Sequence, residues 1–251
     1  MENFDRVEFC RQKFHELFGG EPAGNEGTDP EFMRILQRFI FGEVCAVGSL
    51  DNRMRELITV TILAVNQTLP QLKVHVGAAL NVGCKPLEIR EAIYQLAAFI
   101  GFPKTLNAIS TMNEAFTEAG IALPLEDTAV TTEEDRYEKG LAFQSEIYGD
   151  GIKRKYSYLP EEFAEAIPRF LSELCFGDLM IRNGLDRKTR ELLTVVMFAA
   201  MGDVALQIQS HALGARQAGN TDEEIYSALM HALPYIGFPR LFNALNAMKE
   251  V

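Results

Sequence analysis

Two short stretches decide the fold: Arg55–Val60 reads RELITV, and Arg190–Val195 reads RELLTV. Further matching elements follow both stretches in the same order. They are His75 and His211, Gly83 and Gly219, Ile100–Pro103 and Ile236–Pro239, and Asn107 and Asn243. Self-similarity at one period indicates a tandem duplication. We therefore predict two similar repeats, residues 1–121 and 133–251, joined by a linker at 122–132.

The composition is that of a globular protein with no electrostatic affinity for polyanions. The 251 residues are 47% apolar and carry a net charge of −11. Nucleic acids and anionic membranes attract clustered Lys and Arg, so we expect neither as a partner. The N-terminal MENFDRVEFCRQ shows no secretion signal, and no apolar run reaches the ~20 residues of a membrane span. We expect a cytoplasmic protein.

The cysteines form no C-x-x-C pair; they are Cys10, Cys45, Cys84 and Cys175. Without a secretion signal they are expected to be reduced thiols. Cys45 and Cys175 lie in apolar surroundings, which is typical of small buried hydrophobic residues. The sequence also lacks H-x3-H and carboxylate clusters of ligand spacing. We therefore expect neither a metal nor another cofactor.

Each repeat is predicted to be helical. Arg53–Val65 is apolar on nearly every face after its polar start, which predicts a largely buried helix. Thr68 and Asp203 are the predicted N-caps of the helices that follow, and Gly83 and Gly219 their predicted stops. Other helices are expected at about 5–17, 30–41, 71–81, 86–99, 104–119, 133–147 and 161–176. Since no segment shows strand alternation bounded by hairpin turns, we predict an all-α fold with repeats related by a pseudo-twofold axis.

A Glu and a His recur at matched spacing in the repeats. Glu56 lies nineteen residues before His75, and Glu191 lies twenty before His211. Two antiparallel helices joined by a short break would bring each Glu beside its His. A carboxylate selects the tautomer of an adjacent imidazole, which then exchanges a proton near neutral pH. Both pairs are therefore candidate catalytic groups.

The neighbouring residues allow a structural interpretation as well. Arg55 and Arg190 precede the two Glu residues and are candidates for binding a substrate carboxylate. They are equally suited to ion pairs that neutralise buried Glu and tie the repeats together. Gln71 and Gln207 lie four residues before each His, on the same helix face. These amides either orient the His and the substrate or pack between helices.

Together, R-E-L-x-T, Q-x3-H, A-x3-G and G-F-P resemble the carboxymuconolactone decarboxylase family, which includes the AhpD-like alkylhydroperoxidases. The resemblance covers both repeats and is strongest over Arg55–Asn107 and Arg190–Asn243. It implies an AhpD-like all-helical fold. The family forms rings of six single-repeat chains or trimers of longer ones. The resemblance therefore implies a homotrimer of this chain, a pseudo-hexamer of repeats.

The AhpD-like branch of the family carries E-x11-C-x2-C-x3-H, and this chain departs from it. Thr68 and Gln71 occupy the two Cys positions in the first repeat, and Val204 and Gln207 occupy them in the second. Peroxide reduction by a cysteine pair needs a thiolate of low pKa and a resolving thiol. An AhpD-like, peroxiredoxin-type antioxidant activity is therefore the disfavoured alternative.

The other branch resembles 4-carboxymuconolactone decarboxylase, which lacks the cysteine pair and uses no cofactor. The resemblance implies a carboxy-lyase that removes a carboxylate from a small lactone-type acid and protonates the resulting dienolate. The implied catalytic residues are His75, Glu56, His211 and Glu191, and the candidate substrate-binding residues are Arg55, Arg190, Gln71 and Gln207. A third hypothesis is a non-catalytic helical assembly that binds a ligand and uses the Glu–His pairs structurally.

Overall fold

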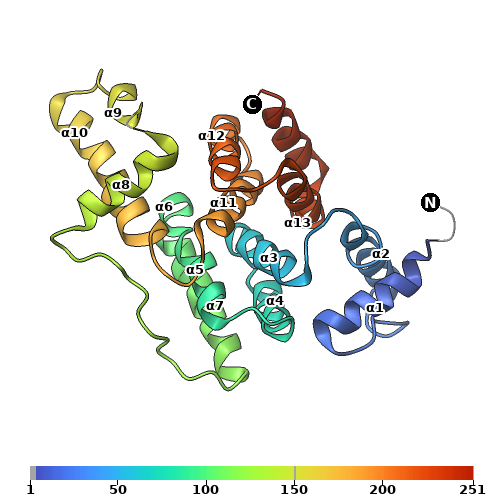
Figure 1. The fold of residues 1–251 in the computed structure, drawn as a ribbon. Coiled ribbons are helices and arrows are strands. Elements are labelled where there is room, and N and C mark those ends of the chain that lie inside the picture. The colour runs from blue at the N-terminus through green and yellow to red at the C-terminus, as the bar shows by residue number, and fades with distance from the viewer. Residues whose placement is uncertain (1–3, 150, 251) are drawn as a thin grey trace.

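The computed structural model describes residues 4–149 and 151–250, and within them it contains helices and no β-strand (Figure 1). The first repeat contains α1 (Arg6–Phe18), α2 (Pro30–Ile40), the 3-10 turn η1 (Val44–Ala46), α3 (Asn52–Asn66), α4 (Leu69–Asn81), α5 (Pro86–Tyr94), α6 (Ala97–Ile100) and α7 (Phe102–Glu118). The second contains α8 (Arg136–Tyr148), α9 (Gly151–Lys155), α10 (Glu161–Phe170), the π-helix η2 (Leu171–Met180), α11 (Arg187–Met201), α12 (Ala205–Gln217) and α13 (Asp222–Met248). The predicted all-α class is confirmed. None of the described helices is long and apolar enough to cross a bilayer.

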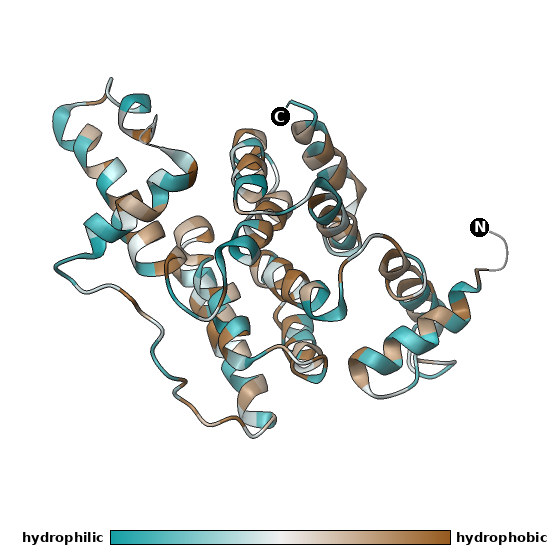
Figure 2. Ribbon diagram, viewed as in Figure 1, coloured by the Kyte–Doolittle hydropathy of each residue, from teal (hydrophilic) through white to brown (hydrophobic). Residues whose placement is uncertain are grey.

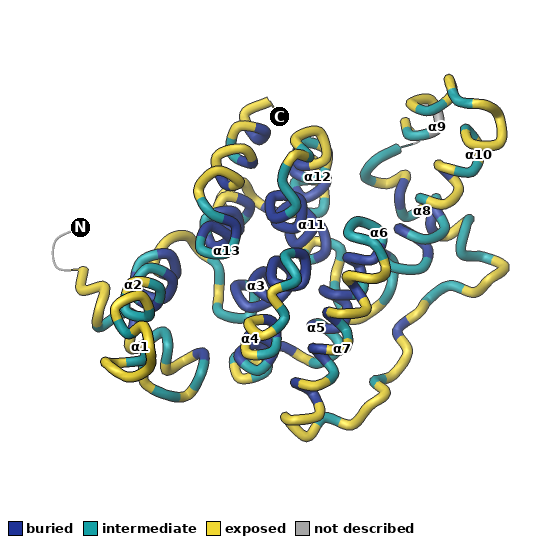
Figure 3. The backbone as a smooth tube through the Cα atoms, turned by 180° about the vertical axis from the view of Figure 1, so that it is seen from behind, coloured by how far each residue is buried: buried dark blue, intermediate teal, exposed yellow. Residues whose placement is uncertain are grey.

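Helices α3 and α11 form the centre of the molecule, with α1 and α2 at one end and α8 to α10 at the other (Figure 1). Every residue from Arg55 to Val65 on α3 and from Arg190 to Ala200 on α11 is buried, as Figure 3 shows for the central tubes. Both helices are apolar on nearly all faces (Figure 2), so each must be covered all round. Their side chains belong to one hydrophobic cluster. The two repeats therefore share a core.

Matched aspartates begin the two central helices. The Asp51 side chain accepts a hydrogen bond from the backbone N–H of Met54 at 2.8 Å, and the Asp186 side chain accepts one from Thr189 at 2.7 Å. Each such cap stabilises a helix by about 1 kcal/mol, because it satisfies an N–H group that has no partner inside the helix. The caps thus fix the start of the helices that carry the two Glu residues.

The helix-end predictions are partly correct. Gly83 and Gly219 adopt left-handed conformations, with φ of 88° and 98°, just after α4 and α12 end. Thr68 precedes α4, but its side chain makes no capping hydrogen bond. The Asp203 cap was wrong, since Asp203 has a φ of 54° and α12 begins one residue later, after Val204. Because Asp203 adopts this left-handed conformation after α11, α12 starts later than predicted.

The second repeat carries elements that the sequence pattern did not predict. The helix expected at 161–176 is α-helical only to Phe170 and continues as η2 to Met180. Pro168 removes one N–H from the helical ladder just before this change. The short helix α9 was not expected. In the first repeat, the helix expected at 86–99 is divided into α5 and α6.

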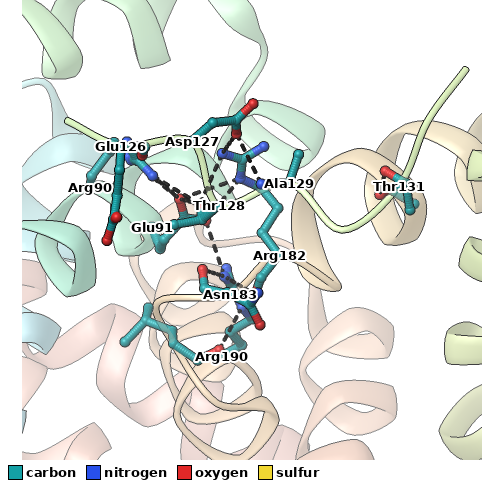
Figure 4. Close-up of polar contacts among 12 residues, drawn as sticks. Arg90, Glu91, Glu126, Asp127, Thr128, Ala129, Thr131, Arg182, Asn183 and Arg190 are labelled. Atoms are coloured by element: carbon teal, nitrogen blue, oxygen red, sulfur yellow. Dashed lines mark hydrogen bonds and ion pairs between the residues drawn. The ribbon is translucent and has the colours of Figure 1, made fainter. Parts of the chain in front are cut away.

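A buried ion network joins the repeats around Glu91 of α5, which is 0% exposed (Figure 4). Its carboxylate lies 3.1 Å from nitrogen atoms of Arg90, Arg182 and Arg190. Thr128, in the linker, donates a hydrogen bond to the same carboxylate at 2.8 Å. A buried carboxylate requires such compensation, because it has lost its hydration. The network therefore attaches the linker and α11 to α5.

The homotrimer stays a prediction, and matched apolar side chains are available on the surface to support it. Phe102 and Leu106 on α7 are 55% and 61% exposed, and their counterparts Phe238 and Phe242 on α13 are 53% and 54% exposed. Exposed apolar groups of this size are typical of protein interfaces. We expect light scattering to give the mass of a trimer and Phe238→Asp to lower it. A monomeric wild-type protein at micromolar concentration would contradict the prediction.

Candidate functional site

The first Glu–His pair is buried between the two repeats. His75 Nδ1 on α4 lies 2.8 Å from Glu56 Oε2 on α3, and the two residues are 9% and 1% exposed. Phe18 of α1 and Tyr235 of α13 lie against the imidazole, with ring centroids 5.7 and 6.0 Å away. Because α13 belongs to the second repeat, neither repeat builds this site alone.

The second pair has a third polar member. His211 Nδ1 on α12 lies 3.2 Å from Glu191 Oε2 on α11. The Tyr148 hydroxyl at the end of α8 donates a hydrogen bond to the same Glu191 oxygen at 2.5 Å and lies 2.7 Å from His211 Nδ1. Phe99 of α6 lies edge-on to the imidazole, with a centroid distance of 6.0 Å. This site also combines elements of both repeats.

The hydrogen bonds determine which nitrogen of His211 carries the proton. Tyr148 has a single hydroxyl hydrogen, which it donates to Glu191, so its oxygen accepts from His211 Nδ1–H. Burial, reinforced by the charge of Glu191, raises the pKa of the Tyr148 hydroxyl, so this hydrogen is retained. Nδ1 is therefore occupied inside the protein. Nε2 is the ring nitrogen that remains for a substrate.

Each histidine has a tyrosine and a phenylalanine beside it, but the two residues occupy opposite positions in the two sites. Tyr148 beside His211 corresponds to Phe18 beside His75, and Phe99 beside His211 corresponds to Tyr235 beside His75. The sequence interpretation missed these residues. A signal was present, because Phe18 and Tyr148 each precede a glycine that recurs in both repeats.

His211 lines a cavity of about 580 Å³. Most of its wall is apolar and aromatic, and it comes from α6, η2, α11 and α12, with α8 and α9 completing the enclosure. Tyr148 and Gln207 also line it, and Lys155 at the end of α9 adds a cationic side chain. An apolar cavity with a few convergent polar groups is the usual form of a small-molecule site. The second pair thus has room for a ligand beside it.

One cysteine, Cys175, lines the same cavity. It is 3% exposed, and burial raises the pKa of its thiol well above the ordinary value, with Glu191 adding to the effect. The thiol is therefore protonated and poorly nucleophilic at neutral pH. All four cysteines of the chain are free and buried, as small hydrophobic residues are.

The predicted substrate-binding residues separate into two groups. Arg55 and Arg190 are 3% and 0% exposed, and neither is among the residues that line the His211 cavity. Arg55 donates hydrogen bonds to backbone carbonyls and to His231, whereas Arg190 belongs to the buried ion network. Both amides are exposed, but Gln207 lines the cavity and Gln71 does not. Gln207 is therefore the better candidate of the two for a ligand contact.

His231 of α13 is a buried, neutral histidine that joins the repeats. Thr59 donates its hydroxyl hydrogen to the Arg55 carbonyl at 2.9 Å, so it accepts from His231 Nε2 at 3.0 Å. His231 Nδ1 then accepts from the Arg55 guanidinium at 3.3 Å. Burial, followed by the positive charge of Arg55, lowers the pKa of His231 to about 3.

The low pKa of His231 leads us to expect a lower free energy of unfolding in acid. The unfolded chain binds a proton at this position below about pH 6.5 whereas the folded chain does not, so the free energy of unfolding falls as the pH falls toward 3. One such histidine contributes a loss of about 2 kcal/mol between pH 7 and pH 5. We expect His231→Gln to reduce this loss, measured by urea unfolding at the two pH values. His15→Gln, at an exposed histidine, is the control, and an unchanged acid loss in His231→Gln would contradict the assignment.

A larger cavity of about 660 Å³ lies between the N-terminal ends of α3 and α11. Its lining includes Arg53 and Lys188, which are already paired with Glu88 and Glu224 at 2.6 and 2.7 Å. Neither histidine of the two pairs lines it. The cations in its wall are therefore neutralised, and the cavity beside His211 is the better candidate for an acidic ligand.

The fold and the two sites define a duplicated helical protein with one Glu–His pair for each repeat. The model of the carboxymuconolactone decarboxylase family matches residues 30–114 and 165–250. The chain belongs to this family.

Two relatives of known name match about one repeat's length. The 4-carboxymuconolactone decarboxylase of Acinetobacter baylyi is 28% identical over 120 residues, covering 47% of this chain and 88% of that protein. The nitrosuccinic acid decarboxylase npaB of Metarhizium robertsii is 32% identical over 111 residues, covering 39% of this chain and 76% of that protein. The similarity supports a decarboxylase-like enzyme of this family.

A solved structure from Burkholderia xenovorans LB400 has the same fold over nearly the whole chain. It is described, provisionally, as a gamma-carboxymuconolactone decarboxylase subunit. The TM-score is 0.55 at 20% sequence identity, with 98% of this chain and 96% of that chain covered. At this identity the likeness concerns the fold.

Proposed function

We propose that this protein is a carboxy-lyase that needs no cofactor and removes CO₂ from a small carboxylated, lactone-type substrate such as 4-carboxymuconolactone. We place the reaction at the Glu191–His211 pair. The observation that carries the proposal is that His211, which lies 3.2 Å from Glu191, lines the apolar cavity of about 580 Å³. Two relatives that bear decarboxylase names support the type of reaction.

In the proposed mechanism the substrate itself accepts the electrons. The bond between the ring carbon and the carboxylate breaks, CO₂ leaves, and the electron pair moves into the conjugated carbonyl as a dienolate. His211, protonated on both nitrogens, donates the Nε2 proton to a carbon of the dienolate, and solvent later restores it. Glu191 stabilises the imidazolium through Nδ1.

The cavity supplies three further contributions. Its apolar wall disfavours the charged carboxylate relative to neutral CO₂, which promotes cleavage. The Lys155 ammonium is available to hold a second carboxylate or the developing enolate oxygen. Gln207 can orient the substrate by hydrogen bonding from the same wall.

The AhpD-like antioxidant activity remains the disfavoured alternative. Among the residues that line the cavity, the candidate nucleophile would be Cys175, and burial keeps its thiol protonated. The non-catalytic alternative would use the same cavity for binding alone. Neither alternative releases CO₂, so CO₂ release distinguishes them from the proposed reaction.

The test is CO₂ release from a panel of small carboxylated lactones, beginning with 4-carboxymuconolactone, with a chelator present. We expect one CO₂ for each substrate consumed and, in D₂O, one deuterium bound to a carbon of the product. Thiol-dependent peroxide consumption without CO₂ release, abolished by Cys175→Ser, would establish the antioxidant alternative instead. Binding of these acids without turnover would favour the non-catalytic one.

A further inference from the structure

We propose that Tyr148 is a positioning residue that acts through His211, and that it makes the two Glu–His pairs of this chain chemically unequal. The inference rests on the proposed function for its kinetic test only. The first observation is the comparison of the two sites within one chain. With Phe18 beside it, His75 lies 2.8 Å from its carboxylate, whereas with Tyr148 beside it, His211 lies 3.2 Å from its own.

The longer distance has a direct cause, because the Tyr148 hydroxyl bridges the pair. It lies 2.5 Å from Glu191 Oε2 and 2.7 Å from His211 Nδ1. The hydroxyl occupies one lone pair of the carboxylate and gives Nδ1–H a second acceptor. Two acceptors fix the orientation of an imidazole ring better than one does. Tyr148 thus helps to keep Nδ1 of His211 bound inside the protein, so that Nε2 is the nitrogen that exchanges a proton with a substrate.

A second, independent observation concerns the space for this hydroxyl. Gly214 lies one helical turn after His211 on α12, and a Cβ added there would lie 2.4 Å from the Tyr148 hydroxyl oxygen, 2.9 Å from its ring carbon Cζ and 3.1 Å from Glu191 Oε2. The corresponding residue of the first repeat is Ala78, three residues after His75. The repeat with a tyrosine therefore has a glycine opposite it, and the repeat with Phe18 has an alanine. The chain makes room for the hydroxyl only where the hydroxyl exists.

The groups that face His211 are few, so the effect of the hydroxyl can be isolated. Among the described residues, Glu191 on α11 and Tyr148 on α8 contact its ring nitrogen, and the other titratable residues that line its cavity are Cys175 in η2, Lys155 on α9 and Tyr156. Burial raises the pKa of the Cys175 thiol, so it carries no charge. Tyr148→Phe leaves both charged neighbours in place. The substitution gives the second site a phenylalanine where the first site has Phe18.

The kinetic test uses Tyr148→Phe and Gly214→Ala. Loss of a residue that orients a functional imidazole costs about 10–100-fold, and we expect kcat to fall by this factor while KM changes little. Glu191 then remains as the acceptor for His211 Nδ1–H, as Glu56 is for His75. Gly214→Ala should act in the same direction, because its Cβ would displace the Tyr148 ring and hydroxyl from their place beside Glu191.

The matched control is Tyr235→Phe, which removes a tyrosine hydroxyl beside His75. It should leave kcat unchanged. A merely structural Tyr148 would lower the melting temperature without a selective fall in kcat at constant KM. An equal loss of kcat in Tyr235→Phe and Tyr148→Phe would overturn the assignment of unequal sites.

A readout without substrate separates this inference from the proposed function. In histidine ¹⁵N spectra of the wild-type protein, we expect a protected Nδ1–H signal from His211. Tyr148→Phe should shift or broaden that signal and leave the His75 signal unchanged. If the wild-type protein releases no CO₂ but the spectra behave in this way, the positioning role stands and the proposed reaction falls. An unchanged His211 signal would refute the positioning role itself.

Discussion

His211→Gln lowers the turnover of the proposed decarboxylation by about 10²–10⁴-fold, the usual contribution of a general acid. The amide keeps much of the side-chain volume but cannot deliver a proton from Nε2. His75→Gln is the matched variant, since His75 belongs to the equivalent pair but does not line the cavity of about 580 Å³. We expect it to change turnover less than about tenfold.

Glu191→Gln should lower turnover less than His211→Gln, because an amide oxygen still accepts a hydrogen bond from Nδ1–H. Glu56→Gln should behave as His75→Gln does. Turnover is measured together with the melting temperature of each variant. If all four substitutions lower stability and none lowers turnover selectively, the pairs are packing elements and the proposed reaction loses its catalytic groups. A larger loss in His75→Gln than in His211→Gln would move the reaction to the first repeat.

Glu91→Gln destabilises the protein by about 3–5 kcal/mol, because breaking a buried ion network leaves unpaired charges in the interior. Glu91 is 0% exposed and contacts Arg90, Arg182 and Arg190, whose charges would then lack their buried carboxylate. Burial already lowers the pKa of Arg190, and Glu91 is the first influence that opposes this effect. For a chain of this size the change corresponds to a fall in melting temperature of roughly 6–20 °C.

Asp127→Asn is the matched control, since Asp127 pairs with Arg182 at 3.3 Å but its side chain is 80% exposed. Asp127→Asn also removes one negative charge, but it should lower the free energy of unfolding by less than about 1 kcal/mol, because water screens an exposed pair. The free energy of unfolding is measured by urea titration at neutral pH. Equal effects of the two substitutions would show that the buried network does not hold the repeats together.

The sequence by itself determined the features that depend on short spans of chain. The duplication, the helical class and the burial of the two central helices follow from local pattern, and the structure confirms the fold class. The proximity of Glu56 to His75 and of Glu191 to His211 also depends on a short span. Each pair lies on a helical hairpin whose length limits the separation of its two helices.

Only the tertiary structure decided which residues complete each site. Tyr148 contacts a histidine 63 residues away, and Arg190 contacts a glutamate 99 residues away. No helical period links such positions. The first contact depends on how α8 packs against α12, and the second depends on how α11 lies relative to α5. The same packing buries both candidate arginines and places Lys155 at the cavity. Local pattern therefore determined the Glu–His pairs, and long-range packing determined their surroundings, because contacts between distant segments form only when the whole core is assembled.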